Sequence, residues 1–193
     1  PHDRANRECV PRRVERLEEA AEEIESKGGQ ALVVPCDVVH YDQVKNLVDK
    51  ALRTFGRIDV MINNAGHALA KSVDDSLVEE IDGQIDVNLK GVCYGSKAVL
   101  PSMIANGGGN IINIGSICSV RHYADYAAYV AAKFGVLGFS RSLYEEVREH
   151  GIRVNVLSPA AVNTEWADVA GAEIPMERQN RIQPEDMAEL AVF

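Results

Sequence analysis

Apolar residues recur along the chain at two spacings, one typical of helices and one of buried strands. From Arg12 to Lys27 they follow one side of a helical repeat with glutamates on the other, and Gly28 follows as a stop signal. The same helical spacing predicts four more helices, Asp42–Phe55, Leu77–Ile104, Tyr126–Glu149 and Pro184–Phe193. The helix over Leu77–Ile104 is expected to be interrupted near Gly91 and Gly95.

Short apolar runs stand between these helices and predict strands buried on both faces, at Ala31–Cys36, Ile58–Ile62, Asn110–Ile114 and Ile152–Leu157. Because strands and helices alternate, we expect βαβ crossovers and a parallel sheet covered by helices on both faces. No repeat or linker divides the chain, so the sequence predicts one α/β domain over residues 1–193. The least patterned stretch, Asn163–Gln183, is expected to be a loop that forms a lid or binding segment.

Composition narrows the classes of function. With a net charge of −9, the chain repels phosphate backbones, so nucleic acid is a poor partner. No apolar stretch approaches the length of a membrane span. The four cysteines form no CxxC pair and no zinc-ligand spacing; they are Cys9, Cys36, Cys93 and Cys118. Their spacing predicts free thiols and no metal site, and free thiols indicate a reducing, cytoplasmic location.

Polar or small residues follow each predicted strand: Asp37, Asn63–Gly66, Gly115–Ser116 and Ser158–Pro159. The carboxyl ends of parallel strands meet at one edge of a sheet, and ligands of open α/β sheets bind outside that edge. These residues therefore predict a shared cleft. The alternative is that they only terminate strands, as turn residues commonly do, and finding polar groups at all four ends favours the cleft.

One tyrosine and one lysine are candidates for acid–base chemistry. Tyr129 and Lys133 lie four residues apart in a predicted helix, so their side chains share a face. A nearby ammonium favours the phenolate and is expected to lower the tyrosine pKa, which would let the phenol exchange a proton with a substrate oxygen. Such pairs are also common on helix surfaces. Ser116, at a strand end before Tyr129, could hold a substrate carbonyl beside it and favours the catalytic interpretation.

Several motifs resemble those of the classical short-chain dehydrogenases/reductases. Asn63–Gly66 matches the family's NNAG motif, and Tyr129–Lys133 matches its YxxxK motif. Ser116 stands at the spacing of the catalytic serine, and Asn88 has the VNxxG context of the catalytic asparagine. The resemblance covers Arg12–Phe193 and includes two further motifs, Cys36–Val38 and Arg153–Pro159.

The resemblance implies a Rossmann-type, doubly wound parallel sheet and reversible hydride transfer between NAD(P)(H) and a small alcohol or carbonyl substrate. Tyr129 would be the general acid/base, and Lys133 would lower its pKa and bind the nicotinamide ribose. Ser116 would orient the substrate oxygen, and Asn88 would support a relay water. Relatives also suggest a homodimer or homotetramer.

The resemblance further implies which residues contact the cofactor. Arg12 falls where relatives place a basic residue that can pair with the 2′-phosphate, which favours NADP(H) over NAD(H). The alternative is that Arg12 only begins a solvated helix. The full set of expected cofactor contacts is Arg12, Asp37, Val38, Asn64, Ala65, Gly66, Tyr129, Lys133, Pro159, Val162 and Thr164.

The chain also departs from the family pattern. Its first glycine is Gly28, so the glycine-rich turn that cradles the pyrophosphate is absent, together with the strand before it. Phe193 falls inside the helix that precedes the family's last strand. We therefore expect a chain truncated at both ends. A non-catalytic fragment that binds no cofactor is one alternative, and an epimerase or dehydratase with the same YxxxK chemistry is another.

Overall fold

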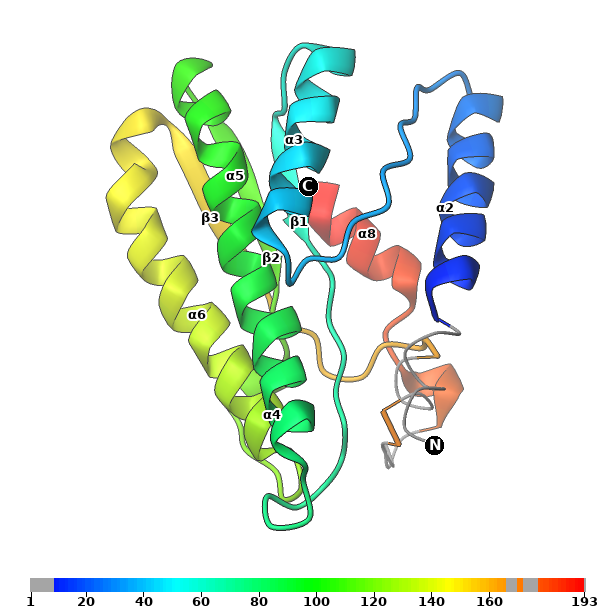
Figure 1. The fold of residues 1–193 in the computed structure, drawn as a ribbon, viewed down its shortest axis with the longest axis vertical. Coiled ribbons are helices and arrows are strands. Elements are labelled where there is room, and N and C mark those ends of the chain that lie inside the picture. Colours follow the sequence, from blue (N-terminus) through cyan, green and yellow to red (C-terminus); the bar gives the residue numbers. More distant parts are fainter. Residues whose placement is uncertain (1–8, 166–169, 172–176, 193) are drawn as a thin grey trace.

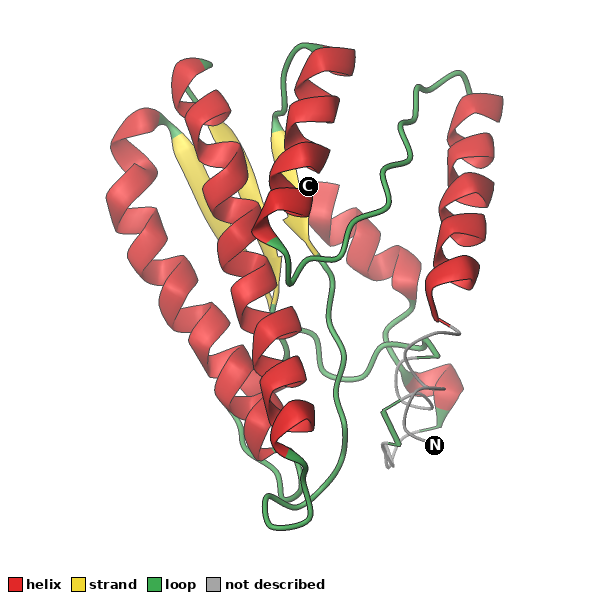
Figure 2. Cartoon of the chain, viewed as in Figure 1, coloured by secondary structure: helices red, strands yellow, loops and turns green. Residues whose placement is uncertain are grey.

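The computed structural model describes residues 9–165, 170–171 and 177–192. Its centre is a parallel sheet of three strands in the order β1 (Val60–Asn63), β2 (Gly109–Ile114) and β3 (Ile152–Leu157). Figures 1 and 2 show these strands side by side behind a layer of helices. Since all three strands run in the same direction, their carboxyl ends meet at one edge.

From β1 onward, helices follow the strands along the chain as the sequence predicts, whereas two helices precede β1. The helices are α2 (Cys9–Ser26), α3 (Tyr41–Phe55), α4 (Val78–Ile85), α5 (Gly91–Ala105), α6 (Ala127–Val147) and α8 (Pro184–Val192). Helix α5 packs against β1, β2 and α3, and α6 packs against β3. Figure 1 shows α3, α5 and α6 standing side by side over one face of the sheet, with α2 apart from them.

The main core lies between the sheet and helices α5 and α6. Its helical members recur four residues apart, and its strand members alternate with residues of the opposite face. Each such side chain, once buried, stabilises the fold by roughly 1.5–3 kcal/mol relative to exposure. The buried members of this core are Val99, Met103, Ile111, Leu143, Val147 and Ile152.

The strand predicted at Ala31–Cys36 is wrong. The segment runs irregularly between α2 and α3, and Leu32 within it is exposed. A strand needs a neighbour that completes its backbone hydrogen bonds. None of the described strands lies beside this segment. Burial of β1 on both faces is also wrong, because Val60 and Ile62 on the face opposite Met61 remain about half exposed.

The helix predicted over Leu77–Ile104 is interrupted at one of the two expected places. A π-helical turn over Asp86–Lys90 separates α4 from α5 and ends at Gly91. Helix α5 then continues through Gly95 without a break. Turns of this kind insert one residue into a helix and are frequent at functional sites. The buried residue of this turn is Asn88.

Candidate active site

Tyr129 and Lys133 lie in the first two turns of α6, which runs through four alanines with high helix propensity: Ala127, Ala128, Ala131 and Ala132. Both side chains face the protein interior, with exposed fractions of 6% for Tyr129 and 4% for Lys133. The lysine Nζ lies 5.6 Å from the centroid of the tyrosine ring. It donates a hydrogen bond of 2.8 Å to the carbonyl of Ile114, at the end of β2.

Ser116 follows β2 and starts a short 3-10 turn, Ile117–Ser119. Its Oγ accepts a hydrogen bond of 3.1 Å from the amide of Cys118, and its own amide donates to the Oγ of Ser119 at 3.2 Å. These two bonds fix the serine in an extended conformation at the sheet edge. A hydrogen bond from Ser116 to Tyr129 acts to lower the tyrosine pKa.

Burial nevertheless decides the protonation of the pair. It raises the pKa of Tyr129 to about 12, against the lowering by the hydrogen bond with Ser116. It lowers the pKa of Lys133 to about 8. In this structure loss of solvent around the phenol dominates its pKa, and the role expected for Lys133 stays a prediction. At neutral pH Tyr129 is a neutral phenol and Lys133 an ammonium.

Asn88 is fully buried and lies next to this pair. Its Nδ2 donates to the carbonyls of His67, at 2.6 Å, and Gln84, at 2.8 Å. Its Oδ1 is buried and accepts no hydrogen bond from the residues that the structure describes. A Cβ placed on Gly66 would lie 2.8 Å from that oxygen and 3.8 Å from the Nζ of Lys133. The turn after β1, the π-helical turn and α6 therefore meet at one point.

Asn63 plays a different part from the one expected for it in the cleft. It is buried between the sheet and α5, where its Nδ2 donates to the Oδ1 of Asn113 at 2.8 Å and to the Oγ of Ser96 at 3.3 Å. Asn113 in turn donates to the Oγ of Ser140 at 2.8 Å. This network joins β1, β2, α5 and α6. In the sequence, polar residues inside otherwise apolar runs are the signal that could have predicted this buried network.

The expected cofactor residues at the sheet edge lie as a group at the ends of β1 and β3. Asn64, Ala65 and Gly66 are exposed just after β1. The carbonyl of Pro159, after β3, accepts a hydrogen bond of 2.7 Å from the amide of Ile117. This bond ties the end of β3 to the turn that follows Ser116.

The remaining expected contacts lie in the loop after β3 and in the part of the chain before β1. Val162 forms an isolated bridge with Ile182, and Thr164 follows it half-buried. Asp37 is exposed in the turn before α3, where Val38 packs against Gly91. Arg12 belongs to α2, but its side chain lies outside the described residues.

Three small residues that sequence reasoning did not identify close over Tyr129. Ala68, Cys118 and Ala170 form a buried cluster with the tyrosine. The amide of Ala70 donates a hydrogen bond of 3.1 Å to the carbonyl of Ala170, which joins the turn after β1 to the loop after β3. No local sequence signal marks such residues, because their role arises from contacts between distant segments.

Two further properties bear on the class of protein. Among the described residues, no group of three histidine, cysteine or acidic side chains is placed to hold a metal ion. None of the described helices combines the length and apolar character needed to cross a membrane.

Comparison with known proteins connects this geometry with one family. The family model of the short-chain dehydrogenases matches residues 4–174. An uncharacterised oxidoreductase of Staphylococcus aureus is 35% identical over 161 residues, which cover 83% of this chain and 68% of that protein. One of Staphylococcus saprophyticus is 35% identical over 180 residues, covering 92% and 75%.

Solved structures agree with this match. An alcohol dehydrogenase from Thermococcus sibiricus, complexed with 5-hydroxy-NADP, has a TM-score of 0.82 and 29% identity, covering 92% of this chain and 74% of its own. A gluconate 5-dehydrogenase from Burkholderia cenocepacia, in complex with NADP and tartrate, has a TM-score of 0.83 and 27% identity, covering 91% and 72%. The predicted Rossmann-type α/β fold is thus confirmed. Together with the family model, these matches show that the chain belongs to the short-chain dehydrogenase family, oxidoreductases that act on alcohol and carbonyl groups.

Proposed function

We propose that this protein transfers a hydride between NADP(H) and a small alcohol or carbonyl substrate, with Tyr129 as general acid/base. The observation that carries the proposal is the buried arrangement of Tyr129, Lys133, Ser116 and Asn88 at the carboxyl edge of the sheet. The nicotinamide ring supplies or accepts the hydride. The residues of the chain bind, orient and move the proton.

Each residue of the site has a role that its surroundings support. With a pKa of about 12, Tyr129 is a neutral phenol that can donate its proton to the substrate oxygen during carbonyl reduction. The Oγ of Ser116 orients that oxygen beside the phenol. Lys133 places a positive charge next to the ring and binds the nicotinamide ribose. The unpartnered Oδ1 of Asn88 accepts a hydrogen bond from a relay water near Lys133.

The cofactor would lie along the exposed edge beyond β1 and β3. The turn Asn64–Gly66, together with Pro159, Val162 and Thr164, would hold the nicotinamide half, and Asp37 and Val38 would face the adenine. Arg12 would pair with the 2′-phosphate, which favours NADP(H). The two similar dehydrogenase structures bound to NADP or its derivative support this preference. We further propose a cytoplasmic homodimer or homotetramer.

A thermal-shift titration with NADPH and NADH tests cofactor binding first. A cofactor at about 100 times its Kd should stabilise the fold by roughly 2.7 kcal/mol, which corresponds to roughly 5–10 °C in Tm. A larger shift with NADPH than with NADH supports the 2′-phosphate contact. A cooperative melt that neither cofactor moves favours the alternative of a chain that binds no cofactor.

Turnover tests the chemistry. NADPH oxidation is followed with 2,3-butanedione and 4-nitrobenzaldehyde as carbonyl probes. Tyr129→Phe keeps the ring but removes the proton, so kcat should fall by about a hundredfold or more while the NADPH thermal shift persists. Full turnover by Tyr129→Phe would show that another group supplies the proton.

A further inference from the structure

The segment that follows the turn after β1 has two different sides. Going along the chain, the carbonyl of His67 bonds to Asn88 of the π-helical turn, and the amides of Leu69 and Lys71 bond to α4 and to the residues before α6. The intervening residues Ala68 and Ala70 instead meet Tyr129 and the carbonyl of Ala170. This alternation is the period of an extended chain. One side therefore faces the site, and the other side holds the segment in place.

Gln84 of α4 makes the central contact on the holding side. Its side chain is only 3% exposed, and its Oε1 accepts a hydrogen bond of 3.1 Å from the amide of Leu69. Its Nε2 donates to the carbonyl of Glu80 at 3.4 Å. The backbone carbonyl of the same residue accepts from Asn88 at 2.8 Å. One residue thus contacts both the segment and the buried asparagine of the site.

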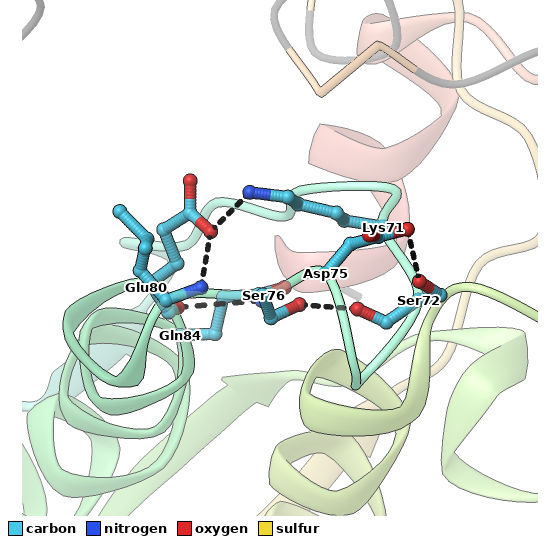
Figure 3. Close-up of polar contacts among 7 residues, drawn as sticks. Lys71, Ser72, Asp75, Ser76, Glu80 and Gln84 are labelled. Atoms are coloured by element: carbon cyan, nitrogen blue, oxygen red, sulfur yellow. Dashed lines mark hydrogen bonds and ion pairs between the residues drawn. The ribbon is translucent and has the colours of Figure 1, made fainter.

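An ion pair holds the far end of the segment, as Figure 3 shows. The Nζ of Lys71 lies 2.7 Å from the Oε2 of Glu80, and this oxygen also accepts a hydrogen bond of 2.8 Å from the amide of Leu77. Both charged side chains are about two-thirds buried. The amide of Lys71 donates to the carbonyl of Asp125 at 2.7 Å. The pair therefore connects the segment, α4 and the residues that precede α6.

Side chains do not fill all the space on this side of the segment. A cavity of about 120 Å³ lies between it, α4 and α6, and Leu69, Lys71, Gln84, Asp125 and Ala128 are among the residues that line it. Where side chains do not fill the space, hydrogen bonds determine the position of the backbone. The position of Ala68 against Tyr129, and that of Ala70 beside Ala170, therefore depend on Gln84 and on the Lys71–Glu80 pair.

We propose that Gln84 is a positioning residue that, with the Lys71–Glu80 pair, sets the wall of the substrate pocket formed by Ala68 and Ala70 and so determines which carbonyl substrates fit beside Tyr129. The proposal rests on the proposed function, because it assigns Tyr129 to the reacting centre. It deepens that function by naming residues of specificity that never touch the substrate.

Gln84→Met tests this role because it keeps the side-chain length and removes the acceptor for Leu69. We expect KM for 2,3-butanedione to rise about fivefold to tenfold, with kcat and KM for NADPH within about twofold of the parent. Gln84→Glu, assayed at pH 6, should restore KM, since a protonated carboxyl accepts from Leu69 and donates to the carbonyl of Glu80. Ser72→Ala is the matched control, because it removes only the exposed hydrogen bond to Asp75 in the same segment.

Amide hydrogen exchange gives a second readout that needs no turnover. Gln84→Met should speed exchange at Leu69 and Ala70, whereas Ser72→Ala and Gln84→Glu should leave it unchanged. Fast exchange in a protein that reduces no carbonyl would support the positioning role and contradict the proposed function. Unchanged exchange, or an equal rise of KM for substrate and NADPH, would overturn the positioning role and leave the proposed function standing.

Discussion

Lys133 carries an ammonium group into a site where only 4% of the residue is exposed. The fall of its pKa from 10.5 to about 8 corresponds to roughly 3 kcal/mol of destabilisation of the charged form. Its hydrogen bond to the carbonyl of Ile114 offsets part of this amount. At the scale of single residues, the buried ammonium therefore lowers the stability of the fold.

Lys133→Met should separate the stability of the fold from turnover. Methionine fills a similar volume without a buried charge, so we expect the variant to be more stable at pH 7 by about 1 kcal/mol, or roughly 2–4 °C in Tm. Carbonyl reduction should fall sharply, because the charge beside Tyr129 is gone. Differential scanning calorimetry and the NADPH assay measure the two effects. An unchanged or lower Tm would contradict the assigned destabilisation.

The pH dependence of this difference has a definite sign. Between pH 8 and 10 folded Lys133 loses its proton, whereas the unfolded lysine keeps it, so the unfolded state binds more protons and the stability of the parent rises with pH. The advantage of Lys133→Met should therefore shrink over this range. Tyr129 acts in the opposite sense only above pH 10, where the unfolded phenol ionises and the folded one does not. Urea unfolding of the parent and of Lys133→Met at pH 7, 8 and 9 measures this difference in stability. A difference that stays the same at all three pH values would refute the prediction.

At the scale of elements, Gly95 sets how closely α5 approaches β1. A Cβ at this position would collide with the Oδ1 of Asn63 and lie 2.8 Å from the Cε of Met61. Asn63 cannot move away freely, because it is hydrogen-bonded to Asn113. Gly95 thus allows the close contact between α5 and β1, and it does not interrupt the helix.

Gly95→Ala should destabilise the protein by about 2–3 kcal/mol, since it disrupts the buried amide network. Gly138→Ala is the matched control within α6, where an added Cβ meets nothing within 4 Å. It should stabilise the protein by about 0.5–1 kcal/mol through helix propensity alone. The urea midpoints of the two variants compare their stabilities, provided that the denaturant dependence of the unfolding free energy is the same for both. Similar midpoints for both variants would mean that α5 shifts to accommodate the methyl group.

The sequence predicts elements well where their stability is local. The apolar stripes predict α3 and α6 to within two residues at each end, and β3 agrees in full. The run Ala31–Cys36 has the same composition as the other strands but no neighbour among the described strands, and a local pattern does not report a missing neighbour.

The candidate site divides in the same way. Motif spacing predicts Tyr129, Lys133, Ser116 and Asn88 as site residues, because residue type and position carry the signal, and the structure brings the four together. Gln84 and Ala170 escape sequence reasoning, since their importance arises from backbone contacts across long separations.

For the whole molecule, helix α6 carries exposed aromatic residues beside its buried face. Phe134 and Tyr144 are 45% and 42% exposed, and a helical repeat places them on one stripe with Leu137 and Arg141. Exposed aromatic and arginine side chains that gather on one face are typical of protein interfaces. This stripe is the surface that we assign to the proposed homodimer.

Phe134→Glu should therefore convert the dimer to a monomer, because two glutamates would meet across a symmetric interface. Val73→Glu, at an exposed apolar position in the loop before α4, should leave the dimer intact. Sedimentation equilibrium measures the mass, with the parent near twice 21.1 kDa. Circular dichroism shows whether each variant remains folded. A monomeric parent would show that the chain does not self-associate, and a dimer that survives Phe134→Glu would place the interface elsewhere. A monomer in both variants would contradict the assignment of the interface to α6.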